Sequence, residues 1–236
     1  MRFFLLVLVS CILGQTVEFK RAFIIHDDHF VKDGEKFRIR AGEMHYSRVV
    51  PEYWLDRMLR MNAMGINTIQ TYVPWNFHEA HEGHFDFSSK SRNLATFLDT
   101  ANEVGLLVVL RAGPYICGEW DFGGLPAFLL NKTGLVIRTH EKQYIEYVKR
   151  YWKQLFTLIK PFLYENGGPI VMIQMENEYG SFGDVESNQN DRIYMETLVN
   201  FTRLHLGEKV IRSYIFCWKK VFKKLPIFNK KKCRSF

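Results

Sequence analysis

The chain alternates short apolar runs with longer segments of helical periodicity, and a polar cluster stands between the two each time. The apolar runs, typical of β-strands, lie at residues 37–41, 66–73, 106–110 and 170–175. The segments with helical spacing begin at Pro51 and then cover about 94–104, 141–164 and 191–205. This alternation predicts four consecutive β/α units, and residues 209–215 predict the start of a fifth strand.

Each predicted strand ends in a polar or aromatic cluster, and none begins with one. The clusters are residues 42–46, 74–79, 111–120 and 176–180. In a (β/α)₈ barrel the active site lies at the C-terminal ends of the strands. A doubly wound sheet places ligands there too, but its Gly-rich phosphate loop does not occur in this sequence. We therefore predict the α/β class and a TIM (β/α)₈ barrel, represented by about its first four β/α units plus the start of a fifth strand.

Composition supports a globular chain and excludes one class of partner. Of the 236 residues, 47% are apolar and 24% charged, which argues against disorder. The formal net charge of +7 is local, because residues 211–236 hold nine of the 32 basic residues and no acidic one. The first 210 residues thus carry 23 basic and 25 acidic side chains. A nucleic-acid interface needs its positive charge on a folded face, so we predict no nucleic-acid partner.

The two ends of the chain differ from its middle. Residues 1–14 have the charged start, apolar core and small-residue exit of a signal peptide, although a buried first strand is the alternative. This run is too short to span a bilayer, so we predict no transmembrane segment, and the signal peptide predicts entry into the secretory pathway. Sequons at Asn131 and Asn200 agree with export. We assign residues 15–210 to the barrel and 211–236 to a basic aromatic tail that is unrelated or disordered. This tail alone is the motivation for the hypothesis of an anion or membrane-surface binder.

Cysteine and histidine spacing gives no metal site. Cys117, Cys217 and Cys233 follow the signal peptide without a C-x-x-C pair, which excludes a zinc cluster and leaves one pairing, Cys217 with Cys233, open. His78, His81 and His84 resemble a ligand set only superficially, because Gly83 indicates a loop. We predict neither a metal nor a cofactor.

The densest chemistry lies at 174–179, where Glu176 and Glu178 follow an apolar strand. Two close carboxylates raise each other's pKa, and burial among Tyr179, Trp120 and Trp75 would raise it further. A carboxyl that stays protonated near neutral pH can act as a general acid. The alternative is that both pair with Arg111 or cap the next helix.

Three segments, 71–79, 111–120 and 167–180, occur in an order that resembles glycoside hydrolase family 35, the β-galactosidase family. The resemblance covers about residues 20–210. It implies that Glu178 is the acid/base, that Asn177 binds the sugar 2-hydroxyl, and that the substrates are β-galactoside glycans.

The resemblance also implies a galactose pocket. Tyr72, Cys117, Gly118 and Glu119 match positions that line it, although the family usually has Ala or Ser where this chain has Gly118. Trp75 and Trp120 either offer ring faces to the sugar or pack in the core. Glu43, His45 and Arg48 orient neighbouring groups or lie on the surface.

Retention requires a second carboxylate about 5 Å from the acid, which the family places at the end of its seventh strand. No acidic residue follows Glu208, so we expect this chain to lack the nucleophile and to be nearly inert by itself. Two hypotheses stay open: a β-galactosidase represented by its N-terminal part, and a non-catalytic galactose-binding or partner-binding fragment.

Overall fold

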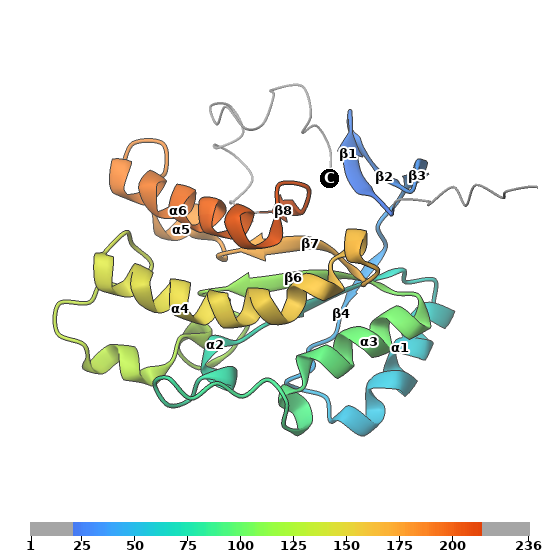
Figure 1. Ribbon diagram of the computed structural model, residues 1–236, viewed down its shortest axis with the longest axis horizontal. Coiled ribbons are helices and arrows are strands. Elements are labelled where there is room, and N and C mark those ends of the chain that lie inside the picture. Colours follow the sequence, from blue (N-terminus) through green and yellow to red (C-terminus); the bar gives the residue numbers. More distant parts are fainter. Residues whose placement is uncertain (1–20, 214–236) are drawn as a thin grey trace, which may run out of the picture.

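The computed structural model describes residues 21–213, and these form two sheets (Figure 1). The first is antiparallel, in the order β1 (Phe23–His26), β2 (His29–Lys32) and β3 (Glu35–Phe37). The second is parallel, in the order β4 (Ala41–Glu43), β5 (Thr68–Tyr72), β6 (Leu107–Gly113), β7 (Ile170–Met175) and β8 (Ile211–Ser213). The predicted signal peptide, both C-terminal cysteines and nearly all of the predicted tail lie outside the described residues.

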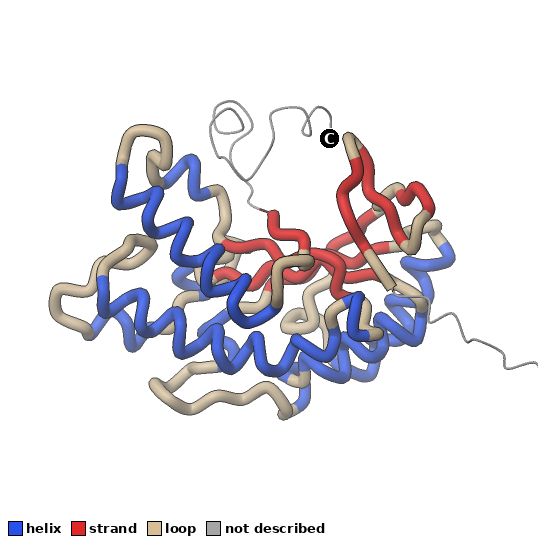
Figure 2. The backbone as a smooth tube through the Cα atoms, turned by 45° about the horizontal axis from the view of Figure 1, so that its top comes forward, coloured by secondary structure: helices blue, strands red, loops and turns tan. Residues whose placement is uncertain are grey.

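Helices connect the parallel strands in sequence. The long ones are α1 (Trp54–Ala63), α3 (Leu94–Val104), α4 (Lys142–Ile159) and α6 (Gln189–Leu206), and the short ones are α2 (Trp75–His78) and α5 (Tyr179–Phe182). Single 3₁₀ turns occupy Pro51–Tyr53, Lys90–Arg92, Asp121–Gly124, Ala127–Asn131, Lys160–Phe162 and Tyr164–Asn166. The four long helices cover one face of the parallel sheet, and no helix among residues 21–213 covers the opposite face (Figure 2). This arrangement confirms the four predicted β/α units and a fifth strand.

Local chemistry sets the ends of these helices. The Asn93 side chain accepts a hydrogen bond from the Thr96 amide at 3.0 Å and so caps α3, which ends at Val104 and is followed by Gly105 with φ +81°. The Glu141 carboxylate caps α4 by accepting from two backbone amides, each at 2.8 Å. The helix predicted over 141–164 stops at Ile159 instead, because Pro161 lacks an amide hydrogen and a 3₁₀ turn follows.

The first predicted strand is wrong in its boundaries. Residues 37–41 divide between two sheets, since Glu35–Phe37 is antiparallel and Ala41–Glu43 is parallel. Between them, the Asn67 side chain accepts from the Arg40 amide at 2.8 Å and donates to the Arg38 carbonyl at 2.9 Å. The Asn67 side chain therefore makes the backbone hydrogen bonds that were expected to come from a neighbouring strand.

The antiparallel sheet packs against the starting ends of the parallel strands. Phe23 and Phe30 stack at 5.4 Å between ring centroids, and they bury Leu107 and Val171 at the beginnings of β6 and β7. This second core lies at the end of the sheet away from the polar clusters. A larger core fills the space between the parallel sheet and its helices. No helix among residues 21–213 is long and apolar enough to cross a membrane.

Candidate active site

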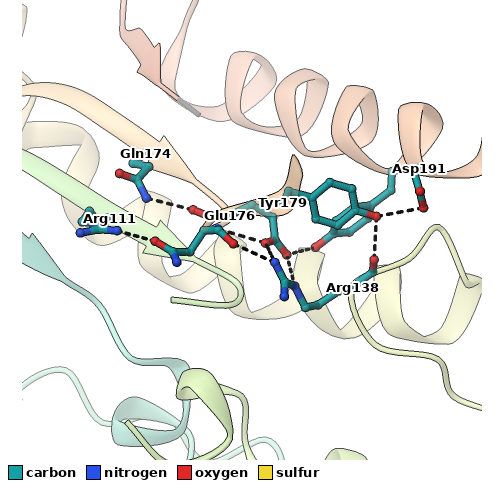
Figure 3. A network of polar contacts seen from close by, with 8 residues as sticks. Arg111, Arg138, Gln174, Glu176, Tyr179 and Asp191 are labelled. Carbon is teal, nitrogen blue, oxygen red and sulfur yellow. Dashed lines mark hydrogen bonds and ion pairs between the residues drawn. The ribbon is translucent and has the colours of Figure 1, made fainter. Parts of the chain in front are cut away.

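The parallel register aligns the polar ends of the strands. Tyr72 of β5 lies opposite Arg111 of β6, and Arg111 lies opposite Gln174 of β7. Directly paired residues present their side chains to the same face, so these three share the face without helices. The Gln174 amide donates to the Glu176 carbonyl at 3.0 Å, which ties the strand to the turn that follows (Figure 3).

Arg111 joins three of the four clusters through one buried guanidinium group. It donates to the Glu43 carboxylate at 3.2 Å and to the Asn177 side-chain oxygen, and it lies 4.0 Å from the Tyr72 ring centroid. Because a guanidinium group only donates, the oxygen of the Asn177 amide must face Arg111. The amide nitrogen of Asn177 is thereby left to donate in another direction.

Glu176 is a buried carboxylate whose two oxygens are both bonded. Oε2 accepts from Arg138 at 2.7 Å and from the Asn177 backbone amide at 3.0 Å, while Oε1 accepts from the Tyr194 hydroxyl at 2.8 Å and from Arg138 Nε at 3.3 Å. Burial raises the pKa of Glu176, although Arg138 and the other donors favour its ionised form. Only 2% of the residue is exposed, so it has no access to a ligand.

Glu178 has the opposite environment two residues further on. It is exposed, and its carboxylate makes no hydrogen bond or ion pair among residues 21–213. It occupies the N-cap position of α5 without a side-chain capping bond, which rules out the capping alternative. The expectation that aromatic residues bury both carboxylates is wrong for Glu178. The pair therefore divides into one structural and one accessible carboxylate.

The residues expected to line a pocket lie beside one another at the ends of β5 and β6. The Gly118 φ is +60°, and a Cβ atom there would lie 3.1 Å from the Tyr72 ring. Cys117 is half-buried and has no disulfide partner among the described residues, whereas Glu119 is exposed. Both have positive φ angles, +58° and +46°. Tyr72 therefore lies between Gly118 and the guanidinium group of Arg111.

The residues of the first cluster orient these neighbours. His45 Nδ1 accepts from the Tyr72 amide at 3.4 Å, and the two rings lie 4.7 Å apart. Arg48 donates to the Gly118 carbonyl, and Glu43 bonds Arg111 as described. Burial lowers the pKa of His45, which favours its neutral form. The orienting interpretation of Glu43, His45 and Arg48 agrees with these contacts.

The two tryptophans have different environments. Trp75 is fully buried, stacks on Tyr151 at 4.9 Å and donates its indole N–H to Glu79 at 2.6 Å. It packs in the core and offers no face to a ligand. Trp120 is only half-buried, and its indole N–H donates to Asn76 at 2.8 Å.

The histidine cluster does not converge on one point. His78 is buried in the core, where Nε2 lies 2.6 Å from the Tyr46 hydroxyl and Nδ1 lies 2.7 Å from the Asp86 carbonyl. His81 and His84 are exposed and pair as an isolated β-bridge. Within residues 21–213, no group of three or more His, Cys, Asp or Glu is arranged to hold a metal ion.

Sequence reasoning missed Arg138 and Tyr194, the two side chains that hold Glu176. Arg138 follows an apolar stretch at 135–137 and is 6% exposed, and Tyr194 is fully buried on α6. A lone arginine in an apolar segment signals a buried partner, but its identity depends on a contact between distant segments. The pairing of Glu176 with Arg111, considered as an alternative, is replaced by the pairing with Arg138.

Comparisons with known proteins agree with this geometry. The family model described as "Glycosyl hydrolases family 35" matches residues 29–228. The match continues past residue 210, where the tail was predicted to begin, and that boundary stays a prediction. Beta-galactosidase 17 of Arabidopsis thaliana is 51% identical over 192 residues, which are 81% of this chain and 26% of that protein. The beta-galactosidase of Mus musculus is 48% identical over 184 residues, 78% of this chain and 28% of that protein.

Solved structures support the fold alone. The exo-beta-1,4-mannosidase Op5Man5 from Opitutaceae bacterium strain TAV5 superimposes with a TM-score of 0.59 at 21% identity, covering 79% of this chain and 33% of that one. A GH5_18 protein from Streptomyces cattleya gives a TM-score of 0.53 at 15% identity, covering 75% and 44%. The chain thus spans little more than a quarter of the two curated relatives named above and a third to less than half of these two solved chains.

Proposed function

Since this chain belongs to glycosyl hydrolases family 35, we propose that it carries the acid/base part of a β-galactosidase site. The substrates are glycans with a terminal β-linked galactose, which are hydrolysed with retention. The proposal rests chiefly on the contrast between Glu176 and Glu178. One carboxylate is buried and fully bonded, and the other is exposed at the same strand end.

Glu178 performs two proton transfers in this account. It first donates its proton to the glycosidic oxygen while a nucleophilic carboxylate attacks the anomeric carbon and the bond to the aglycone breaks. It then removes a proton from the water that attacks the glycosyl intermediate, which releases galactose and restores both carboxyl groups. We place the nucleophile in the part of the family's barrel that this chain does not span.

The neighbouring residues bind and orient the sugar. The Asn177 amide nitrogen, turned away from Arg111, donates to the 2-hydroxyl. Tyr72, Cys117 and Gly118 line the pocket, and the exposed Glu119 carboxylate accepts hydrogen bonds from sugar hydroxyls. Burial raises the pKa of Tyr72, so its phenol stays neutral and can donate as well as accept.

A secretory route completes the proposal, with residues 1–14 as signal peptide and a lysosomal or extracellular destination. The exposed Asn131 is an accessible glycan acceptor. The sequon at Asn200 differs, because the hydroxyl of Thr202 is buried in α6 and donates to the Leu198 carbonyl at 2.9 Å. Peptide mapping of protein secreted by eukaryotic cells tests the cleavage after residue 14 and the glycosylation of Asn131 and Asn200.

A second candidate is a non-catalytic galactose-binding or partner-binding fragment. It is motivated by Tyr72, Glu119 and Asn177, which would contact a sugar without any proton transfer. It keeps the roles of Asn177 and the pocket but assigns no proton transfer to Glu178.

Cleavage of a β-galactoside with an alkyl leaving group, in the presence of azide as a substitute for the nucleophile that this chain lacks, separates the two candidates when it is combined with galactose titration. Turnover that Glu178→Gln abolishes and Glu176→Gln preserves supports the enzyme. Saturable galactose binding without any turnover supports the binding fragment. Absence of both, in a protein shown to be folded by circular dichroism, contradicts the proposed site.

A further inference from the structure

Arg138 lies behind the turn that carries Asn177 and Glu178, in the segment between Ala127–Asn131 and α4. Its guanidinium group is 3.8 Å from the Tyr115 ring centroid and 4.1 Å from that of Phe182. These rings hold the planar group in one orientation. The side chain is 7% exposed, so solvent cannot compete for its hydrogen bonds.

Arg138 binds the turn at two separate points through its side chain. Nη2 donates to Glu176 Oε2 at 2.7 Å and also to the main-chain oxygen of Asn177 at 2.8 Å (Figure 3). The second contact reaches the peptide group that joins Asn177 to Glu178. The fork of Arg138 therefore fixes the backbone immediately before Glu178 as well as the carboxylate of Glu176.

The main chain of Arg138 adds a third point. Its carbonyl accepts from the Tyr179 hydroxyl at 2.9 Å, and that hydroxyl also lies 3.1 Å from Asp191 on α6 (Figure 3). Contacts of Arg138 thus bracket Glu178 on both sides along the sequence, at residues 176–177 and at residue 179.

The turn needs such external support. Glu176 and Glu178 have φ angles of +59° and +49°, a region that residues with side chains rarely adopt. Local preference would return both residues to negative φ, which would turn the Asn177 amide and the Glu178 carboxylate to other directions. Backbone in this region persists only where the surrounding contacts determine it.

We propose that Arg138 is a positioning residue, whose contact with the Asn177 carbonyl sets the directions of the Asn177 amide and the Glu178 carboxylate toward the sugar. The effect on sugar binding rests on the proposed function. The effect of Arg138 on the backbone of the turn does not depend on it. The competing interpretation is an ion pair that only stabilises the fold.

Arg138→Lys in the full 236-residue chain separates the two interpretations. Lysine keeps the positive charge for Glu176, but it lacks the planar fork that reaches the Asn177 carbonyl at the same time. The side-chain amide resonances of Asn177, assigned by ¹⁵N NMR without sugar, should shift and broaden in Arg138→Lys. Galactose affinity should fall about tenfold, the equivalent of about one hydrogen bond, while the thermal midpoint stays within a few degrees of wild type.

Arg150→Lys is the matched control. Arg150 pairs with Glu79, another fully buried carboxylate, and none of its side-chain contacts within residues 21–213 involves the turn at 176–179. The same substitution there should leave the Asn177 resonances and the galactose affinity unchanged. Equal changes in both variants would show a general loss of stability and would overturn the positioning role.

Unchanged Asn177 resonances in a folded Arg138→Lys protein would also overturn it. If that variant does not fold, Glu176→Gln decides the question, because it removes the ion pair and leaves the Arg138 contact with the Asn177 carbonyl. We expect wild-type Asn177 resonances in Glu176→Gln, and their loss would assign the control of the turn to Glu176. If wild type binds no galactose, the proposed function fails, but the sugar-free resonances still test Arg138.

Discussion

At the residue scale, position within a short turn gives two carboxylates of one type opposite environments. Glu176 and Glu178 are two residues apart and of one type, yet one is 2% exposed and bonded on both oxygens while the other is exposed. The sequence allowed the strand end and the pair to be predicted from an apolar run followed by carboxylates. The pattern could not show which carboxylate is buried, because the partners of Glu176, Arg138 and Tyr194, come from distant segments of the chain.

Gly118 permits a residue-scale test of the pocket wall. Gly118→Ala places an L residue at φ +60° and a methyl group 3.1 Å from the Tyr72 ring, so the ring must move by a few tenths of an ångström. We expect a loss of about 1 to 2 kcal/mol in the free energy of unfolding from the backbone alone, and more from the contact. Urea denaturation gives the value.

The control for this substitution is Gly134→Ala. Gly134 has φ +77° with open space where its Cβ would lie, so it reports the backbone cost without a contact. Gly118→Ala should lose more stability than Gly134→Ala. Equal losses would mean that the Tyr72 ring moves aside at no cost. The presence of glycine at position 118, where the family usually has Ala or Ser, would then have no consequence for the pocket.

At the scale of elements, predictions succeeded where local signals and tertiary packing agree. The helix at about 94–104 was predicted from its apolar stripe and from Gly105 as a stop signal, and the structure adds Asn93 as its N-cap. The antiparallel sheet was not predicted, although Asp33-Gly34, with φ angles of +53° and +90°, is a hairpin turn signal. The start of β4 could not be predicted, because the Asn67 side chain determines it.

The buried His78 at the end of α2 should make the free energy of unfolding depend on pH in acid. Burial of His78 lowers its pKa to about 4, so the folded chain keeps it neutral while the unfolded chain protonates it near pH 6.5. The unfolded state binds more protons between these values, so the free energy of unfolding falls as pH falls from 6.5 to 4. We expect this histidine to contribute about 3 kcal/mol to that fall.

Urea denaturation between pH 6.5 and 4 measures the contribution. The slope should flatten in His78→Gln and stay unchanged in His81→Gln, since His81 is exposed. A slope in His78→Gln as steep as that of wild type would assign the acid sensitivity to other groups.

At the scale of the whole molecule, the two ends of the parallel sheet have different surroundings. The antiparallel sheet covers the starting ends of the strands through Phe23 and Phe30, which pack with Tyr164, while the opposite ends carry the polar clusters. The long helices within residues 21–213 lie on one face of the parallel sheet (Figure 2), and Tyr72, Arg111 and Gln174 share the opposite face. The barrel class was predictable from alternation and strand-end polarity, whereas the antiparallel addition needed contacts between distant segments.

Phe23→Ala tests whether the antiparallel sheet stabilises the whole molecule. Phe23 is 7% exposed within the second core, and its truncation should cost about 3 kcal/mol in the free energy of unfolding. Ile24→Ala on the same strand removes a side chain that is 46% exposed and should cost much less. A single cooperative transition with a lower midpoint is expected for Phe23→Ala, and an unchanged midpoint would show that the sheet is an independent appendage.

The central claim, that Glu178 is a proton donor beside a bound β-galactoside, is tested most directly with azide and a β-galactoside that has an alkyl leaving group. Azide replaces the nucleophile by attacking the anomeric carbon, while Glu178 gives its proton to the departing oxygen. We predict α-galactosyl azide, identified by NMR, from wild type and Glu176→Gln but not from Glu178→Gln. Equal formation of this azide by wild type and Glu178→Gln, or none by folded wild type that binds galactose, would contradict the account.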